Sequence, residues 1–307
     1  MLDRLTTEQR NPASAAIDRM SAIELVRLMN AEDARVAEAV GREAEAIAKA
    51  VEIIARQLRA GGRLVYIGAG TSGRLGVLDA SECPPTFNTP PELVVGLIAG
   101  GHGALTRSLE GAEDRRETAV DELRRIGLTQ ADVVVGIATS GRTPYVLAGL
   151  EYARSLGAAA IGLSCNPDPL LAGSCDFTIA PVVGPEVLSG STRLKAGTAT
   201  KMVLNMLTTG AMVRLGKTYG NLMVDLRATN TKLVDRSQRI VGELTGLPPD
   251  DARAALARAG GDVKTAVVSV LVNVGPEEAR RRLARADGHL RRALETPVAP
   301  AAPDETP

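Results

Sequence analysis

Short apolar runs alternate with stretches of helical periodicity from residue 61 onward. The runs are rich in β-branched residues and lie at 64–67, 93–99, 133–138, 158–163 and 177–180, and helical patterns separate most of them, including those at 112–126 and 144–156. Strands that are apolar throughout are buried on both faces, and their alternation with helices is typical of parallel sheets. The pattern predicts an α/β fold, a doubly wound and mainly parallel sheet covered by helices on both faces.

The segments on either side of this region have helical patterns of their own. Ahead of it, residues 1–12 are polar and extended, and residues 22–29 and 31–59 have the spacing of amphipathic helices, which Ser21 or Asn30 can cap. Behind it come helical periods at residues 252–259, 263–272 and 276–294, with a Gly260-Gly261 break between the first two.

These patterns divide the chain into four parts. We expect residues 1–60 to pack as helices on the sheet domain or on a partner subunit, and residues 61–240 to form the sheet domain. Residues 241–295 should form a small three-helix module that resembles a ubiquitin-associated domain in shape, with a role in packing or dimerisation. Residues 296–307 repeat proline and alanine and should be disordered.

A turn of small and hydroxylated residues follows the first strand. This first turn, residues 68–73, reads Gly-Ala-Gly-Thr-Ser-Gly. Glycine lets the backbone approach a ligand, and the helix that follows presents unpaired N–H groups, so Gly70, Thr71 and Ser72 suit a phosphate. The spacing also matches a dinucleotide fingerprint, but no acidic residue ends the second strand to hold a ribose, which favours a sugar phosphate. A tight turn without a ligand is the simpler alternative.

Two later strands are followed by similar turns. The second turn, residues 139–145, carries Ser140, Gly141, Arg142 and Thr143, and the third turn, residues 184–198, carries Ser191, Thr192 and Lys195 ahead of a helix-like run at 199–215. Ligands of doubly wound sheets bind beyond the carboxyl ends of the strands. Three such turns predict a phosphorylated or otherwise anionic small ligand, although Arg142, Arg193 and Lys195 could equally be surface cations.

Composition removes several function classes. The 36 Lys and Arg residues balance the 36 Asp and Glu residues, so nothing indicates a nucleic acid or an anionic membrane surface. Three cysteines without metal-ligand spacing and two histidines argue against a metal site or a Ser-His-Asp triad, and we expect no cofactor. The charged start and the lack of a long apolar run favour a cytoplasmic protein without a membrane span.

Proton transfer would then fall to carboxylates, Lys or Tyr. Glu82 stands at the far end of the helix that begins at the first turn, where we expect Pro84 and Pro85 to stop it. Glu113 follows the glycine break at Gly111 and precedes a helix. Each also has an ordinary interpretation, because Glu113 could be a first-turn acid that favours the helix dipole and Glu82 a solvated side chain.

The chain resembles the N-acetylmuramic acid 6-phosphate etherases, a family built on the sugar isomerase (SIS) fold. The resemblance covers residues 5 to 295 approximately, and it rests on the combination of residues 7–12, 68–76, 79–87, 110–114, 138–145 and 190–198. It implies a homodimeric, cytoplasmic lyase of cell-wall recycling, which removes D-lactate from the 3-position ether of N-acetylmuramic acid 6-phosphate and leaves N-acetylglucosamine 6-phosphate.

The resemblance also implies roles for single residues. Glu82 matches the family's proton donor, and Glu113 matches its second active-site glutamate. The hydroxyls expected around phosphate and sugar belong to Thr71, Ser72, Ser140, Thr143, Ser191 and Thr192. In the open-chain aldehyde, the carbonyl activates the C2 proton, so we hypothesise that Glu82 shuttles a proton between C2 and the departing lactyl oxygen while Glu113 assists the water that adds.

Two other activities occur on this fold. Glucokinase regulatory proteins bind sugar phosphates without catalysis, and aldose–ketose isomerases need a base that serves C1 and C2. The single SIS-type unit and the presence of both Glu82 and Glu113 favour the etherase over the regulator, and the sequence context of Glu82 favours it over the isomerase.

Overall fold

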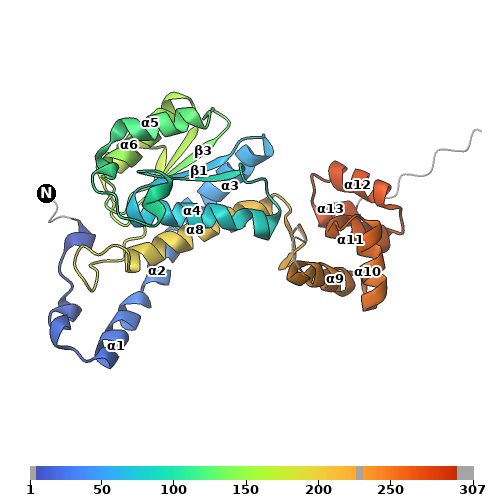
Figure 1. Cartoon of the computed structure of the whole chain (residues 1–307), viewed down its shortest axis with the longest axis horizontal. Helices are drawn as coiled ribbons and strands as arrows, with labels where there is room; N and C mark the ends of the chain where they lie inside the picture. Colours follow the sequence, from blue (N-terminus) through green and yellow to red (C-terminus); the bar gives the residue numbers. More distant parts are fainter. Residues whose placement is uncertain (1–4, 226–230, 296–307) are drawn as a thin grey trace, which may run out of the picture. The chain divides into compact units, whose positions relative to one another are not determined.

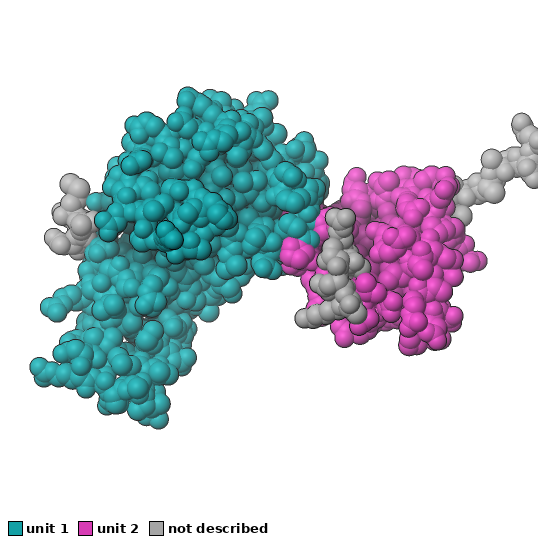
Figure 2. All heavy atoms as spheres, in the orientation of Figure 1, with its two compact units in different colours: residues 1–84, 89–211 teal, residues 85–88, 212–307 magenta. Residues whose placement is uncertain are grey.

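The computed structural model describes residues 5–225 and 231–295. Contacts group the chain into two compact units, one of residues 1–84 and 89–211 and the other of residues 85–88 and 212–307 (Figure 2). The second unit begins at residue 212, earlier than the boundary expected after residue 240. The reason is that Val224 is buried in the core of the helical module together with Ile240 of helix α9 (Thr231–Thr245), and that Tyr219 packs against this core.

The first unit contains a parallel sheet of five strands in the order β2-β1-β3-β4-β5. The strands are β1 (Leu64–Gly68), β2 (Val94–Ile98), β3 (Val133–Ile137), β4 (Ala159–Leu163) and β5 (Phe177–Ile179). All five lie within the predicted apolar runs or extend one residue beyond them, and every residue of β1 and β3 is buried. The predicted α/β sheet is therefore confirmed.

Helices cover both faces of this sheet (Figure 1). Helices α5 (Arg116–Arg125) and α6 (Pro144–Ser155) lie on one face, where Val65 and Ile67 of β1 join their core. Helices α3 (Ala44–Arg59), α4 (Gly70–Phe87) and α8 (Lys195–Arg214) lie on the other, which Tyr66 of β1 faces. Helix α7 (Pro169–Ser174) packs beside α6.

An ion pair holds the amino ends of β1 and β3 together. The carboxylate of Asp132 accepts hydrogen bonds from the Arg63 guanidinium at 2.9 and 3.1 Å, and from the backbone N–H groups of Arg63 and Thr129, both at 2.8 Å. Burial acts to raise the pKa of Asp132, but these hydrogen bonds outweigh it and lower the pKa from its ordinary value.

Three helix predictions were wrong in their bounds. The helix expected over residues 276–294 is divided into α12 (Pro276–Arg285) and α13 (Leu290–Glu295), because Asp287 and Gly288 between them have left-handed backbones, so the C-terminal module has more than the three helices expected. Helix α4 does not stop at the double proline but continues to Phe87, because the fixed φ of proline is compatible with a helix and the left-handed Asn88 (φ 52°) ends it. The helix expected over residues 31–59 is split among the end of α1 (Ala22–Asp33), α2 (Val36–Gly41) and α3. Ser21 is the N-cap of α1, whereas Asn30 lies inside it.

The rest of the described chain completes the two units. Short 3₁₀ helices lie at Thr6–Glu8, Pro12–Ser14, Ile17–Arg19, His102–Leu105 and Ala112–Asp114. The second unit contains the hairpin of β6 (Thr218–Tyr219) and β7 (Leu222–Met223), helix α9, and helices α10 (Pro249–Arg258), α11 (Val263–Val272), α12 (Pro276–Arg285) and α13 (Leu290–Glu295). No described helix has the length and apolarity that crossing a membrane requires.

The tail expected to be disordered, residues 296–307, lies outside the described residues.

We predict that Asp132→Asn lowers the free energy of unfolding by about 1–3 kcal/mol at neutral pH, because it weakens hydrogen bonds to a buried carboxylate. The folded pKa of Asp132 is lowered, so its stabilisation is complete above the unfolded pKa of about 4 and is lost as the pH falls below it. The difference in the free energy of unfolding between wild type and variant, measured by urea titration, should therefore become smaller as the pH falls. A difference that stays constant with pH would contradict the assignment.

Candidate active site

The first turn brings two backbone segments unusually close. An ideal Cβ on Gly73 would lie 2.6 Å from the carbonyl oxygen of Gly68, and Gly70 has a φ of 54° that favours glycine. Helix α4 begins at Gly70, so the exposed backbone of this residue and the half-buried Thr71 stand at a helix start. This geometry is suited to an anion, as the sequence predicted.

The second turn is held by an ion pair. Arg142 donates from Nε to the buried carboxylate of Asp168 at 2.6 Å, which fixes the direction of the guanidinium. Gly141 has a φ of 77°, and a Cβ there would lie 2.6 Å from the Cβ of Asp168, so only glycine fits. Ser140 Oγ accepts the N–H of Arg142 at 3.2 Å. Thr143 is the N-cap of α6 but makes no capping hydrogen bond, so its hydroxyl can serve a ligand.

The third turn is organised by two buried acids. The carboxylate of Glu186 accepts the N–H groups of Lys195 and Ala196 at 3.0 and 2.9 Å, and so caps the start of α8. The ammonium of Lys195, which we expected to bind substrate, donates instead to Glu32 at 2.6 Å, and both side chains are buried. Burial acts to raise the pKa of Glu32, but Lys195 and Asn11 outweigh it and lower the pKa.

The structure joins the three turns at one edge of the sheet. Ser72 and Thr139 share a hydrogen bond of 3.3 Å between the first and second turns. An ideal Cβ on Gly197 would lie 3.8 Å from the Thr71 methyl group, so the third turn adjoins the first. The predicted ligand residues of these turns therefore lie around one region.

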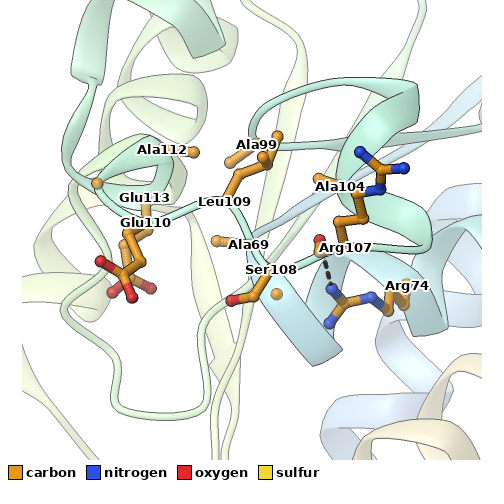
Figure 3. Close-up of a pocket in the computed structure, with 12 residues that line it drawn as sticks. Ala69, Arg74, Ala99, Ala104, Arg107, Ser108, Leu109, Glu110, Ala112 and Glu113 are labelled. Atoms are coloured by element: carbon orange, nitrogen blue, oxygen red, sulfur yellow. Dashed lines mark hydrogen bonds between the residues drawn. The ribbon is translucent and has the colours of Figure 1, made fainter.

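A cavity of about 260 Å³ connects the first turn with Glu113 (Figure 3). Glu113 lies in the 3₁₀ helix Ala112–Asp114, which the left-handed Gly111 (φ 71°) precedes. Arg74 of α4 holds the loop before it by donating to the carbonyls of Leu105 and Arg107 at 3.0 and 3.1 Å. The cavity is lined by Ala69, Gly70, Arg74, Ala99, Ala104, Arg107, Ser108, Leu109, Glu110, Gly111, Ala112 and Glu113.

Comparison with known proteins identifies the family. A family model described as "SIS domain" matches residues 124–210, and one described as "Glucokinase regulatory protein N-terminal SIS domain" matches residues 46–154. The chain is 62% identical over 267 residues to the N-acetylmuramic acid 6-phosphate etherase of Rhodopirellula baltica, which covers 87% of this chain and 88% of that protein. The chain belongs to the N-acetylmuramic acid 6-phosphate etherase family.

Other members of the etherase family are nearly as similar. The protein of Vibrio vulnificus is 55% identical over 269 residues, which is 88% of this chain and 90% of that one. The protein of Streptomyces avermitilis is 56% identical over 269 residues, which is 88% of this chain and 86% of that one. The match thus extends well beyond the SIS domain.

Glu82, the proton donor that the resemblance implies, lies elsewhere in the chain. Glu82 is exposed on α4, twelve residues after Gly70, which at 1.5 Å per residue is about 18 Å along the helix axis. It does not line the cavity that holds Glu113. Within this chain, the two predicted catalytic glutamates therefore do not line a common cavity.

A buried carboxyl fixes the part of α4 that carries Glu82. Asp79 lies one helical turn before Glu82 and accepts hydrogen bonds from Tyr66 at 2.9 Å and from Asn205 of α8 at 2.8 Å. Burial raises the pKa of Asp79, and these hydrogen bonds only partly oppose the rise. Helix α4 is thereby held to both β1 and α8 at this turn.

Sequence reasoning missed three polar residues of this region. Glu110 lines the cavity beside Glu113, and Figure 3 shows the two side chains pointing the same way. Asn166 and Asp168 follow β4 at the same edge of the sheet. The rule that ligands bind beyond strand ends would have indicated Asn166 and Asp168. Within residues 5–225 and 231–295, no three His, Cys, Asp or Glu side chains gather as metal ligands would.

We predict that Lys195→Met destabilises the protein by about 3 kcal/mol, because it removes the buried cation from Glu32 and leaves only the exposed Arg35, 3.3 Å away, to pair with that carboxylate. Combining it with Glu32→Met should recover part of the loss. Lys201→Met, on the exposed side of the same helix, serves as the control and should change stability by less than about 0.5 kcal/mol. Unfolding in guanidinium at neutral pH measures the stability of all three variants. If Lys195→Met and Lys201→Met lower the free energy of unfolding equally, the buried ion pair is not important for stability.

Proposed function

We propose that this protein is a lyase that cleaves the D-lactyl ether of N-acetylmuramic acid 6-phosphate, giving N-acetylglucosamine 6-phosphate and D-lactate. The observation that carries the proposal is the cavity shared by Gly70 of the phosphate-type first turn and Glu113. A carboxylate and a turn suited to a phosphate on one cavity support a site for a phosphorylated sugar at which a side chain can transfer protons. The reaction is inferred from the N-acetylmuramic acid 6-phosphate etherases of other organisms to which the chain is similar.

The three turns would bind the phosphate and sugar. The proposed ligands are Gly70, Thr71, Ser72, Ser140, Gly141, Arg142, Thr143, Ser191 and Thr192. Lys195 has a structural part in this proposal, because binding the substrate would require its ammonium to leave Glu32. The phosphate lies far from the carbons that react, so its binding energy serves to orient the sugar.

The reaction would proceed by elimination followed by addition of water. In the open-chain form, the C1 aldehyde acidifies C2, and a carboxylate removes that proton. The C3–O bond breaks, the lactyl oxygen receives the proton, and a C2=C3 double bond forms. Water then adds its oxygen to C3 and a proton returns to C2. We assign the proton shuttle to Glu82 and assistance of the water to Glu113; no cofactor is needed for these steps.

A second subunit would supply Glu82. The separation of Glu82 from the Glu113 cavity within one chain favours a homodimer in which each site combines Glu113 of one subunit with Glu82 of the other. Exposed apolar side chains support such an interface: Leu78 of α4 is 53% exposed, and Ile23 and Val26 of α1 are 55% and 62% exposed.

We also propose a cytoplasmic location. The three cysteines are free and buried, which is typical of a protein from a reducing compartment. Burial raises the pKa of Cys83 and of Cys165 to about 12, so both remain thiols at neutral pH. Cys83 therefore has no nucleophilic part in the proposed reaction, although it adjoins Glu82.

The first test is the release of D-lactate from N-acetylmuramic acid 6-phosphate by the purified protein. We expect wild type to release it, and we expect Glu82→Gln to lower kcat by about a hundredfold or more and to abolish exchange of the C2 proton with solvent deuterium. Tight binding of sugar phosphates without D-lactate release would instead favour a regulator, the function named in the match to residues 46–154. Full C2 exchange by Glu82→Gln would remove Glu82 from its role.

Mixed dimers test whether the site is shared. Glu82→Gln and Glu113→Gln subunits, each inactive alone, should regain roughly a quarter of wild-type activity after mixing and exchange, because half the dimers are hybrids and each hybrid has one intact site. If both glutamates act from the same subunit, the mixture stays inactive. Wild-type subunits treated identically control for losses during the exchange.

A further inference from the structure

The N-terminal strap, residues 5–14, lies against the carboxyl edge of the sheet. Leu5 and Thr7 are 4% and 0% exposed, so this polar segment is part of the folded unit from its first described residue. Its side chains and backbone form hydrogen bonds with residues that lie 159 to 181 positions later in the sequence. Nothing in the proposed reaction uses the strap.

Asn166 ties the strap to the second turn. Its amide oxygen accepts the N–H and the hydroxyl of Thr6, both at 2.8 Å. Its amide nitrogen donates to Thr7 Oγ1 and to the carbonyl of Thr139, both at 3.0 Å. The side chain is 1% exposed and uses both donors and both acceptor positions of an amide, so water cannot replace a lost partner at low cost.

The strap is tied to the third turn as well. The carbonyl of Thr7 accepts the N–H of Gly190 at 3.3 Å, and the carbonyl of Glu8 accepts the hydroxyl of Ser189 at 3.1 Å. Asn11 donates to the carbonyl of Pro185 at 3.2 Å. The segment from residue 184 to residue 194 forms neither helix nor strand, so such bonds take the place of regular secondary structure in fixing its shape.

We propose that Thr7 and Asn166 are positioning residues for sugar-phosphate binding, a role that rests on the proposed function. Thr7 is bonded through its side chain to Asn166, and so to the second turn, and through its carbonyl to the third. The strap sets the spacing between the hydroxyls of these turns before a ligand arrives. Neither residue touches the ligand, since both are buried beneath the turns.

The test replaces one buried hydroxyl. Thr7→Val keeps the shape of the side chain but leaves the amide of Asn166 without an acceptor, whereas Thr7→Ser keeps the hydroxyl. In the full-length enzyme, Thr7→Val should raise KM for N-acetylmuramic acid 6-phosphate and Kd for N-acetylglucosamine 6-phosphate about tenfold, with kcat changed less than about threefold. Thr7→Ser should restore both constants to near wild type.

Thr89→Val is the matched control. Thr89 is also buried, but its hydroxyl has no hydrogen-bond partner within the described chain, and it precedes β2 at the opposite edge of the sheet. Its loss should leave KM and Kd unchanged. Ser189→Ala, at an exposed position, breaks the bond to Glu8 without risk to folding and should raise Kd by about two- to threefold.

Amide hydrogen exchange of the ligand-free protein measures directly whether the strap stabilises the second and third turns. Thr7→Val should speed exchange of the Gly190 amide and of the second turn, while the amides of β1 and β3 stay as protected as in wild type. If Thr7→Val leaves KM, Kd and the amide exchange rates unchanged, the strap does not position the turns. Absence of sugar-phosphate binding by wild type would instead reject the proposed function, and with it any role of the strap in binding.

Discussion

The site depends on the chain leaving β1 and β3, two neighbouring strands, in opposite directions across the sheet. After β1 the chain returns to β2 on one side, and after β3 it returns to β4 on the other. Connections over opposite faces leave a crevice between two adjacent strand ends. The first and second turns meet there because β1 and β3 are paired in register, Gly68 beside Ile137. Their hydroxyls then lie within hydrogen-bond distance through Ser72 and Thr139, without any long loop to guide them.

Buried polar side chains, rather than apolar packing, determine the shape of the loops at this edge. Asp168, Asn166 and Glu186 are each buried, and each joins backbone or side chains from different segments. A buried polar group that loses its partner costs more than the bond itself contributes, so such networks favour one arrangement over its neighbours. The edge can thus remain rich in hydroxyls and charges without losing a defined shape.

Local pattern predicted the strands and the turns, since a strand buried on both faces must be apolar and a strand end that meets a helix must turn. It could not predict that α4 passes Pro84 and Pro85, because it does not contain distant contacts of that helix such as the hydrogen bond of Asp79 with Asn205, 126 residues away. Nor could it pair Lys195 with Glu32, which are 163 residues apart. Nor does local pattern show that Glu82 lies outside the cavity that Glu113 lines, because that depends on the length and direction of α4.

The strap also has a consequence for biogenesis. Residues 5–14 leave the ribosome well before their partners Asn166, Pro185 and Ser189, which lie 160 to 181 positions further along the chain than the strap residues they bond. Closing contacts over about 160 residues is entropically costly and slow compared with local pairing. The nascent sheet can therefore assemble from β1 to β4 while its edge is still open. Closure of that edge has to wait for a residue as late in the chain as Ser189, so the second and third turns can reach their final spacing only after the strands have been synthesised.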